Sequence, residues 1–284
     1  MNDVIIIGKG PAGISAALYL KRAGVEPLVI GKDLGSLSGY KTPIENYYGI
    51  KGPVTGEGLI EDGITQARAL GITVIDDAVI ALEQDPDAFI VRTPNETFQS
   101  RVVLLATGKT RTTLQIPGFR DFRGKGISMC AMCDGYFYRN KHLGIVGCGP
   151  YMAKEADVLM RLAKSVTVFT DGKPLETDVP YTVVTERLKA FVGDTKLRAI
   201  ETGTGTYPLD GVFVAVGVPS SIEFANQLGV VMEKETIVVD GSYMTNVDGL
   251  FAAGDAIGGR LQIAKAAFDG MAAADSIYQY LKRS

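Results

Sequence analysis

Residues 4–13 of the chain read VIIIGKGPAG, and this stretch decides the fold. The run Val4–Ile7 is short, β-branched and followed at once by glycine, which is typical of a buried parallel strand. Apolar residues at helical spacing follow from Ile14, and residues 25–30 form a second mostly apolar run. A strand, a glycine turn, a helix and a strand in this order predict a βαβ unit that binds a dinucleotide.

The three glycines of this turn have separate expected roles. Gly8 makes the tight turn, Gly10 lets the backbone approach a pyrophosphate, and Gly13 lets the helix pack closely on the strand. The pyrophosphate is expected at the positive N-terminus of the helix, beside Pro11 and Ala12. The alternative is an α/β turn without a ligand, which the strand before the turn and the helix after it disfavour.

One part of the dinucleotide motif is missing. An acidic residue usually ends the second strand and holds the ribose, whereas this chain has Gly31, Lys32 and Asp33 there. The sequence therefore does not show which residues contact an adenosine.

A second glycine turn begins a similar unit later in the chain. Residues 143–146 predict a strand, residues 147–150 read GCGP, and residues 152–163 predict a helix that leads to a strand at 166–169. Two such openings predict an α/β fold with two Rossmann-like, three-layer domains.

The C-terminal part returns to the first domain. Residues 245–255 read TNVDGLFAAGD, in which a strand ends in Gly254-Asp255 before an apolar helix that starts near Ile263. The Asp255 carboxylate is placed to bind a sugar or ribityl hydroxyl, although Asp255 can equally cap the last helix. We therefore expect residues 113–217 to be a domain inserted between 1–112 and 218–284.

Two cysteines three residues apart, Cys130 and Cys133, carry the expected chemistry, because such a pair can close a small disulfide ring. A zinc site needs about four ligands. Cys148 and His142 would have to complete it, and Cys148 belongs to the second glycine turn, so no metal is expected. Asp134 lies directly beside a thiol and is a candidate proton carrier.

The composition excludes several classes of function. A net charge of −3 gives no reason to expect nucleic acid or an anionic membrane as a partner. No apolar run reaches the roughly 18 residues that span a bilayer. The chain has one histidine, which excludes poly-histidine metal sites, and three cysteines, which do not form a secreted disulfide framework. We expect a cytoplasmic protein.

Several segments together resemble the low-molecular-weight thioredoxin reductases. They are CAMCDGYFYRN at 130–140, PIENYYG at 43–49, ATG at 106–108, IPG at 116–118 and FAAGD at 251–255. The similarity spans nearly the whole chain. It implies a homodimer of the FAD/NAD(P)-linked disulfide oxidoreductase type, in which 1–112 and 218–284 bind FAD and 113–217 carries the redox disulfide.

The resemblance also implies roles for individual residues. Cys133 should face the flavin, Cys130 should attack the disulfide of thioredoxin, and Asp134 should be the acid and base. The implied FAD contacts are Gly8, Gly10, Pro11, Ala12, Gly13, Asn46, Ala106, Thr107, Gly108, Gly254, Asp255 and Gln262.

Departures from the family concern the electron donor. The small residue that closes the second glycine motif is replaced by Met152, and the His-Arg-Arg run that holds the 2′-phosphate of NADPH is replaced by Thr170-Asp171-Gly172. We expect Lys173 to be the only cation near the end of the strand at 166–169. The flavin segment Gly-Gly-Gln-Leu is replaced by residues 35–38, GSLS, and the Arg-Gln pair by Leu261-Gln262. The inserted domain is also shorter. These departures resemble the ferredoxin-dependent flavin thioredoxin reductases of anaerobic bacteria.

Four functions remain open from the sequence. The first is a thioredoxin reductase fed by ferredoxin, in which two electrons would fall by roughly 6 kcal/mol between about −400 mV and about −270 mV. The second is an NADH- or NADPH-dependent thioredoxin reductase. The third is a dithiol oxidase that uses oxygen; similar oxidases tend to carry histidine after the second cysteine, where this chain has Asp134. The fourth is a flavin redox sensor without catalysis.

Overall fold

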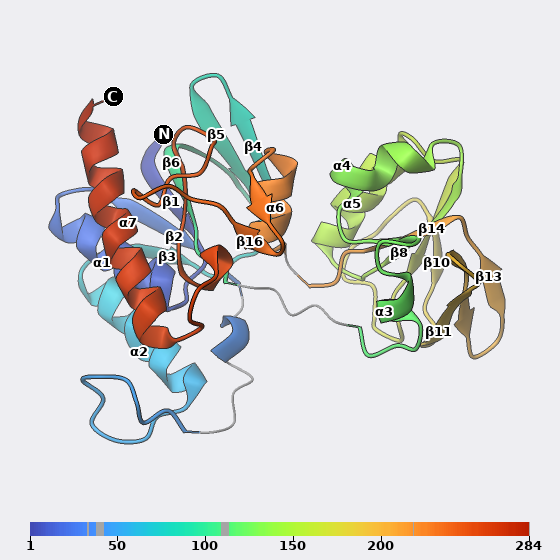
Figure 1. Cartoon of the computed structure of the whole chain (residues 1–284), viewed down its shortest axis with the longest axis horizontal. Coiled ribbons are helices and arrows are strands. Elements are labelled where there is room, and N and C mark those ends of the chain that lie inside the picture. Colours follow the sequence, from blue (N-terminus) through green and yellow to red (C-terminus); the bar gives the residue numbers. More distant parts are fainter. Residues whose placement is uncertain (33, 38–42, 109–113, 218, 284) are drawn as a thin grey trace. The chain divides into compact units, whose positions relative to one another are not determined.

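The computed structural model describes residues 1–32, 34–37, 43–108, 114–217 and 219–283, and it describes only the backbone of Ser36 and Cys133. The expected crossovers at 112–113 and 218, and the departures at Asp33 and Ser38, lie outside the described residues. The chain forms two compact units, one of Met1–Arg111 with Ser220–Ser284 and the other of Thr112–Pro219 (Figure 1).

The first unit is built on a seven-stranded sheet in the order β3-β2-β1-β6-β5-β4, with β17 also paired to β6. β1, β2, β3, β6 and β17 pair in parallel, whereas β4, β5 and β6 pair antiparallel. The strands are β1 (Asn2–Ile7), β2 (Pro27–Ile30), β3 (Thr73–Ile75), β4 (Ala81–Asp85), β5 (Ala88–Arg92), β6 (Thr97–Leu105) and β17 (Leu250–Ala252).

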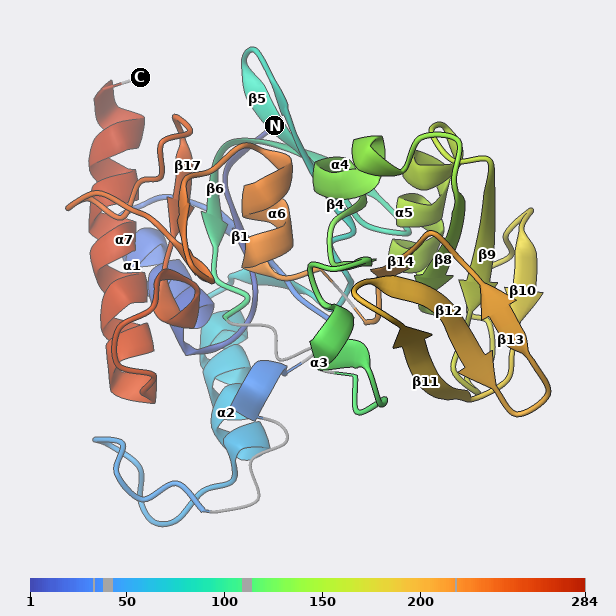
Figure 2. The ribbon, with the colours of Figure 1, turned by 45° about the vertical axis from the view of Figure 1, so that its right-hand side comes forward.

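Helices and a small hairpin complete this unit. They are α1 (Pro11–Arg22), α2 (Gly56–Ala69), α6 (Ser221–Gln227) and α7 (Ile263–Arg283), the 3-10 turns η1 (Gly35–Leu37) and η3 (Gly254–Ile257), and the hairpin β15 (Met232–Glu233) and β16 (Thr236–Ile237). α1 and α7 lie side by side (Figure 2). They approach so closely that a Cβ atom at Gly270 would lie 2.0 Å from the Ala12 carbonyl oxygen.

The alternation of side chains along β1 produces the three layers of the first unit. Val4 and Ile6 belong to the core beneath α1 and α7, while Ile5 and Ile7 belong to the core on the opposite face, which includes Phe224 of α6. All four side chains are at most 2% exposed. The prediction of a strand buried on both faces is therefore confirmed.

The second unit repeats this plan around the parallel sheet β10-β9-β8-β14-β7, beside the antiparallel sheet β11-β12-β13. Its strands are β7 (Ile127–Ser128), β8 (His142–Val146), β9 (Ser165–Phe169), β10 (Thr182–Val184), β11 (Leu188–Gly193), β12 (Leu197–Thr202), β13 (Thr206–Pro208) and β14 (Gly211–Val214). Its helices are α3 (Phe119–Phe122), α4 (Ala131–Asp134), η2 (Gly135–Tyr138) and α5 (Pro150–Met160).

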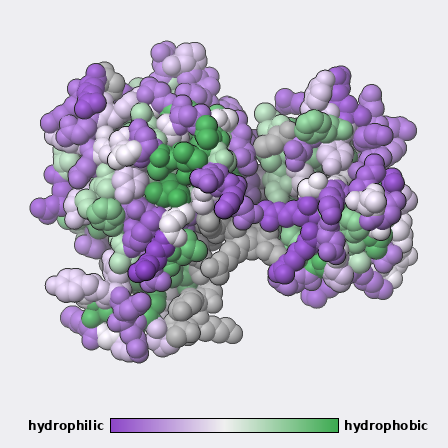
Figure 3. Space-filling view, viewed as in Figure 1, coloured by the Kyte–Doolittle hydropathy of each residue, from purple (hydrophilic) through white to green (hydrophobic). Residues whose placement is uncertain are grey.

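The expected α/β fold class, with one Rossmann-like unit inserted into another, is confirmed. Most of the surface visible in Figure 3 is hydrophilic, and smaller apolar patches lie on the visible face of each unit. Within the described part of the chain, none of the helices is both long and apolar enough to cross a membrane.

Candidate active site

The first glycine turn is shaped by close contacts within the backbone. Gly8 has φ 117°, and a Cβ atom there would lie 2.4 Å from the carbonyl oxygen of Ala106. A Cβ atom at Gly13 would lie 1.9 Å from the carbonyl oxygen of Gly8. A Cβ atom at Gly10, the N-cap of α1, would meet nothing within 4 Å. The turn is thus tightly packed at Gly8 and Gly13 and open at Gly10, where the first amides of α1 can hold a phosphate.

The end of β6 closes one side of this turn. The Thr107 hydroxyl lies 2.8 Å from that of Ser221 and accepts a bond from the Ser221 amide at 2.5 Å, and the Thr107 amide donates to the Ser221 hydroxyl. The predicted contact residue Thr107 therefore uses its side chain and amide to hold α6. Gly108 follows with φ 71°.

The Gly254-Asp255 turn lies against the start of α1 and is supported by two charged residues of α7. A Cβ atom at Gly254 would lie 2.9 Å from the Ala12 side chain. The buried Asp269 accepts from the Gly254 amide at 3.1 Å and pairs with Lys265 at 2.6 Å. The Lys265 ammonium in turn donates to the Gly254 carbonyl. This network fixes the half-buried Asp255 beside the first glycine turn.

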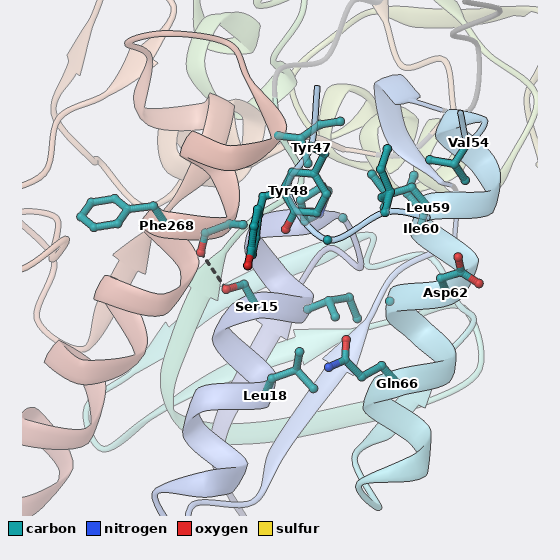
Figure 4. A pocket seen from close by; sticks show the side chains of 18 of the residues that line it. Ser15, Leu18, Tyr47, Tyr48, Val54, Leu59, Ile60, Asp62, Gln66 and Phe268 are labelled. Carbon is teal, nitrogen blue, oxygen red and sulfur yellow. Dashed lines mark hydrogen bonds between the residues drawn. The ribbon is translucent and has the colours of Figure 1, made fainter. Parts of the chain in front are cut away.

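A pocket of about 1020 Å³ begins at the first glycine turn and runs along α1 between α2 and α7 (Figure 4). Gly10 and Pro11 form one end, and the Ser15 hydroxyl in its wall donates to the Ala267 carbonyl at 2.7 Å. Asn46 and Gln262, both exposed, directly precede the lining residues Tyr47 and Ile263. The lining also includes Ile14, Leu18, Tyr19, Tyr48, Leu59, Ile60, Phe268 and Met271.

These features of the first unit fit a dinucleotide such as FAD. The amides of Ala12 and Gly13, above the open face of Gly10, would hold its pyrophosphate, and the fixed Asp255 would bind a hydroxyl of its sugar or ribityl chain.

The second unit holds the cysteine pair at the short helix α4. Cys130 is disulfide-bonded and 7% exposed, whereas Cys148 is a free thiol. The backbone of Cys133 lies within α4, three residues further on, and its side chain is outside the described part. Burial and the charge of Glu176 raise the pKa of the Cys148 thiol, which makes it a poor nucleophile.

A buried serine connects the cysteine to the expected proton carrier. The Ser128 hydroxyl donates to Asp134 Oδ2 at 2.6 Å and accepts from the Cys130 amide at 3.1 Å. Burial, and next the negative charge of Asp134, raise the pKa of Tyr138. The structure thus brings Cys130 and Asp134 together through Ser128, which the sequence reasoning missed although it lies two residues before the cysteine.

A second carboxylate lies beneath the same helix. Glu155 of α5 is 3% exposed, and its Oε2 accepts from the amide of Ala131, the residue that follows Cys130. A separation of 24 residues leaves no local signal by which the sequence could reveal this contact.

Large exposed side chains follow Cys130 closely in the sequence. Met132, Tyr136 and Phe137 are 59%, 66% and 78% exposed. All three lie within seven residues of Cys130, and exposed apolar side chains of this size can contribute to a protein-binding surface.

The second glycine turn differs from the first at two of its three positions. A Cβ atom at Gly147 would lie 2.3 Å from the Ala215 carbonyl oxygen, which repeats the tight contact at Gly8. Gly149 corresponds to the open Gly10, but a Cβ atom there would lie 2.9 Å from Oε2 of Glu176. The position of Gly13 is taken by Met152, which is fully buried.

The backbone of Glu176 is held by the turn, and its exposed side chain lies beside Cys148 and Gly149. Its amide donates to the Cys148 carbonyl at 2.8 Å, and its Oε1 lies 3.7 Å from the Cys148 sulfur. A carboxylate thus lies beside the approach that the first turn leaves open to a phosphate, and it places a negative charge there.

The expectation that Lys173 is the only cation near the end of β9 is wrong. The side chain of Arg187 packs against Gly172, where a Cβ atom would lie 2.6 Å from its Cγ. One oxygen of Asp171 is already used within the chain, because Oδ1 accepts a hydrogen bond from the Leu188 amide at 2.8 Å. Arg187 could not be predicted from the sequence, because it lies 15 residues after Gly172 and returns to it only once the chain has formed β10.

Comparisons with known proteins agree with this geometry. The model of the pyridine nucleotide-disulphide oxidoreductase family matches residues 2–183 and 181–270. A thioredoxin reductase from Rickettsia prowazekii is 33% identical over 279 residues, which cover 89% of each chain.

Two solved structures are similar over almost the whole chain. The atypical thioredoxin reductase TRi from Desulfovibrio vulgaris Hildenborough is 34% identical, with a TM-score of 0.87 and coverage of 100% of this chain and 99% of that one. A ferredoxin-flavin thioredoxin reductase from Clostridium acetobutylicum is 29% identical, with a TM-score of 0.72 and coverage of 99% and 98%. The chain belongs to the thioredoxin reductase family of the pyridine nucleotide-disulphide oxidoreductases.

Proposed function

We propose that the protein is an FAD-dependent thioredoxin reductase that receives electrons from ferredoxin rather than from a nicotinamide. The observation that carries this proposal is the contrast between the two glycine turns. The turn of the first unit is open at Gly10, whereas the turn of the second unit has the Glu176 carboxylate beside Gly149 and the Met152 side chain against Gly147.

The disulfide region supports the acceptor half of the reaction. The Cys130 thiolate attacks one sulfur of the thioredoxin disulfide, forming a mixed disulfide and releasing the other sulfur, which takes a proton from Asp134. Cys133 then attacks the sulfur of Cys130, re-forming the Cys130–Cys133 disulfide and releasing reduced thioredoxin. Ser128 would orient Asp134 through its 2.6 Å hydrogen bond.

Bound FAD would collect two electrons from a one-electron donor and deliver them together to the disulfide. The first unit would hold it through Gly8, Gly10, Pro11, Ala12, Gly13 and Asp255, with Asn46 and Gln262 beside the ring system. The Clostridium acetobutylicum relative is described as a ferredoxin-flavin enzyme, which supports the choice of donor. We also expect a homodimer in the cytoplasm, as the family implies.

One observation favours a second candidate. Arg187 beside Gly172 is a cation near the place where the family holds the 2′-phosphate of NADPH. NADPH-dependent thioredoxin reduction is therefore the alternative, and Glu176 opposes it because a carboxylate repels the pyrophosphate.

Turnover with photoreduced ferredoxin tests the proposal. The purified protein should contain one FAD per chain and should reduce thioredoxin with photoreduced ferredoxin, and Cys130→Ser should abolish this turnover. Turnover with NADPH but not with ferredoxin would replace the proposal by the alternative. A colourless protein, or one that contains FMN, would contradict the cofactor.

A further inference from the structure

The carboxyl ends of three neighbouring strands form a row in the first unit. Ile7 of β1 is paired with Ile30 of β2, which is paired with Ile75 of β3. Gly31 and Asp76 directly follow Ile30 and Ile75, and Lys9 lies two residues beyond Ile7. An adenosine attached to a pyrophosphate at α1 would extend along this edge, because ligands of open α/β sheets bind at the carboxyl ends of the strands.

A buried lysine crosses the end of β2. Lys9 is 6% exposed, and a Cβ atom at Gly31 would lie 3.2 Å from both the backbone nitrogen and Cγ of Lys9. Any side chain at position 31 would crowd this lysine. Lys9 therefore favours glycine at the end of the second strand, where the motif usually has an acidic residue.

The ammonium group of Lys9 forms an ion pair with the carboxylate of Asp76, with 2.6 Å between Nζ and Oδ1. A buried ammonium requires such a partner, because an unpaired charge in the interior is costly. Asp76 is nevertheless 67% exposed. Its carboxylate is thus anchored through one oxygen and accessible from solvent, which suits an acceptor that is positioned before its ligand arrives.

The neighbouring carboxylate is engaged within the chain. Asp77 accepts from the Ala78 amide at 2.8 Å through Oδ1 and from the Asn95 side chain at 2.9 Å through Oδ2. Of this adjacent pair, Asp76 is therefore the one suited to bind a ligand.

We propose that Asp76, held by Lys9, binds the ribose hydroxyls of the adenosine half of FAD. The carboxylate that usually stands at the end of the second strand is supplied here from the third. This inference rests on the proposed FAD cofactor and assigns two residues that the glycine motif does not predict.

Flavin binding to the flavin-depleted full chain tests the assignment, with fluorescence quenching as the readout. Asp76→Asn should weaken FAD by about 10- to 100-fold, the effect of losing a hydrogen bond to a charged group. The same variant should bind FMN as the unmodified protein does, because FMN lacks adenosine. ADP, used as a competitor of FAD, should lose affinity by the same factor as FAD.

Two further variants distinguish ligand binding from stability. Lys9→Met should also weaken FAD, and the double variant should lose less than the product of the two single effects because the residues act as a pair. Glu26→Gln is the matched control, since it removes the carboxylate of the Lys21–Glu26 pair near the other end of α1. It should change neither FAD nor FMN binding.

Unchanged FAD affinity in Asp76→Asn, or equal losses for FAD and FMN, would overturn the inference and leave a structural ion pair. Failure of the unmodified chain to take up FAD would instead overturn the proposed cofactor, and this inference with it.

Discussion

Replacing Glu176 by glutamine removes the charge that closes the second glycine turn, so this change should allow a nicotinamide nucleotide to bind more tightly. Glu176 is exposed, and its Oε2 lies 2.9 Å from the Cβ position of Gly149. A phosphate at about 4 Å from this carboxylate would be repelled by about 1 kcal/mol per unit charge in a water-like environment. Glu176→Gln should therefore lower the dissociation constant of NADH about fivefold and no further, because Met152 remains.

The assay is quenching of NADH fluorescence, carried into the millimolar range at low salt. The gain should shrink in 1 M salt, where charges in solvent are screened beyond about 3 Å. Glu186→Gln is the matched control, because Glu186 belongs to the same unit but bonds to Thr204. Micromolar NADH binding by the unmodified protein, with no change in Glu176→Gln, would refute the reasoning that Glu176 closes the turn.

Three further predictions concern the disulfide region. Cys130→Ser should leave a thiolate beside the reduced flavin, detected as a long-wavelength absorbance band, whereas Cys133→Ser should lose this band and trap thioredoxin as a mixed disulfide; the opposite pattern would exchange the two roles. Asp134→Asn and Ser128→Ala should both slow dithiol exchange, measured by stopped flow, while the flavin content stays at one per chain; an unchanged rate would remove both residues from proton transfer. Glu155→Leu should lower the free energy of unfolding by roughly 1–3 kcal/mol, measured by urea denaturation, because the Ala131 amide loses its buried acceptor; unchanged stability would contradict the importance of this contact.

The fold could be predicted from the sequence because its signals are local. A β-branched run followed by glycine appears at Val4–Ile7, a mostly apolar run precedes Gly147, and each run forms the expected strand. Met152 at the place of a glycine is also a local signal, and the structure gives its consequence, a fully buried side chain at the start of α5.

The charged partners of the site could not be predicted in this way. Lys9 meets Asp76 across 67 residues, and Glu176 reaches the turn at Gly149 across 27. Such contacts depend on how the strands are ordered in the sheet, and a single sequence carries no pattern at that distance. Ser128 is the exception, because a hydroxyl two residues before a cysteine lies within reach of its amide.

Anaerobic reduction of the flavin by different donors tests the central claim most directly. The oxidised protein is mixed in turn with photoreduced ferredoxin, NADH and NADPH at micromolar concentration, and the flavin absorbance is followed by stopped flow with oxidised thioredoxin present or absent. The account predicts rapid bleaching by ferredoxin and reoxidation by thioredoxin, with no bleaching by either nicotinamide. Rapid, stoichiometric bleaching by NADH or NADPH, followed by turnover, would contradict it.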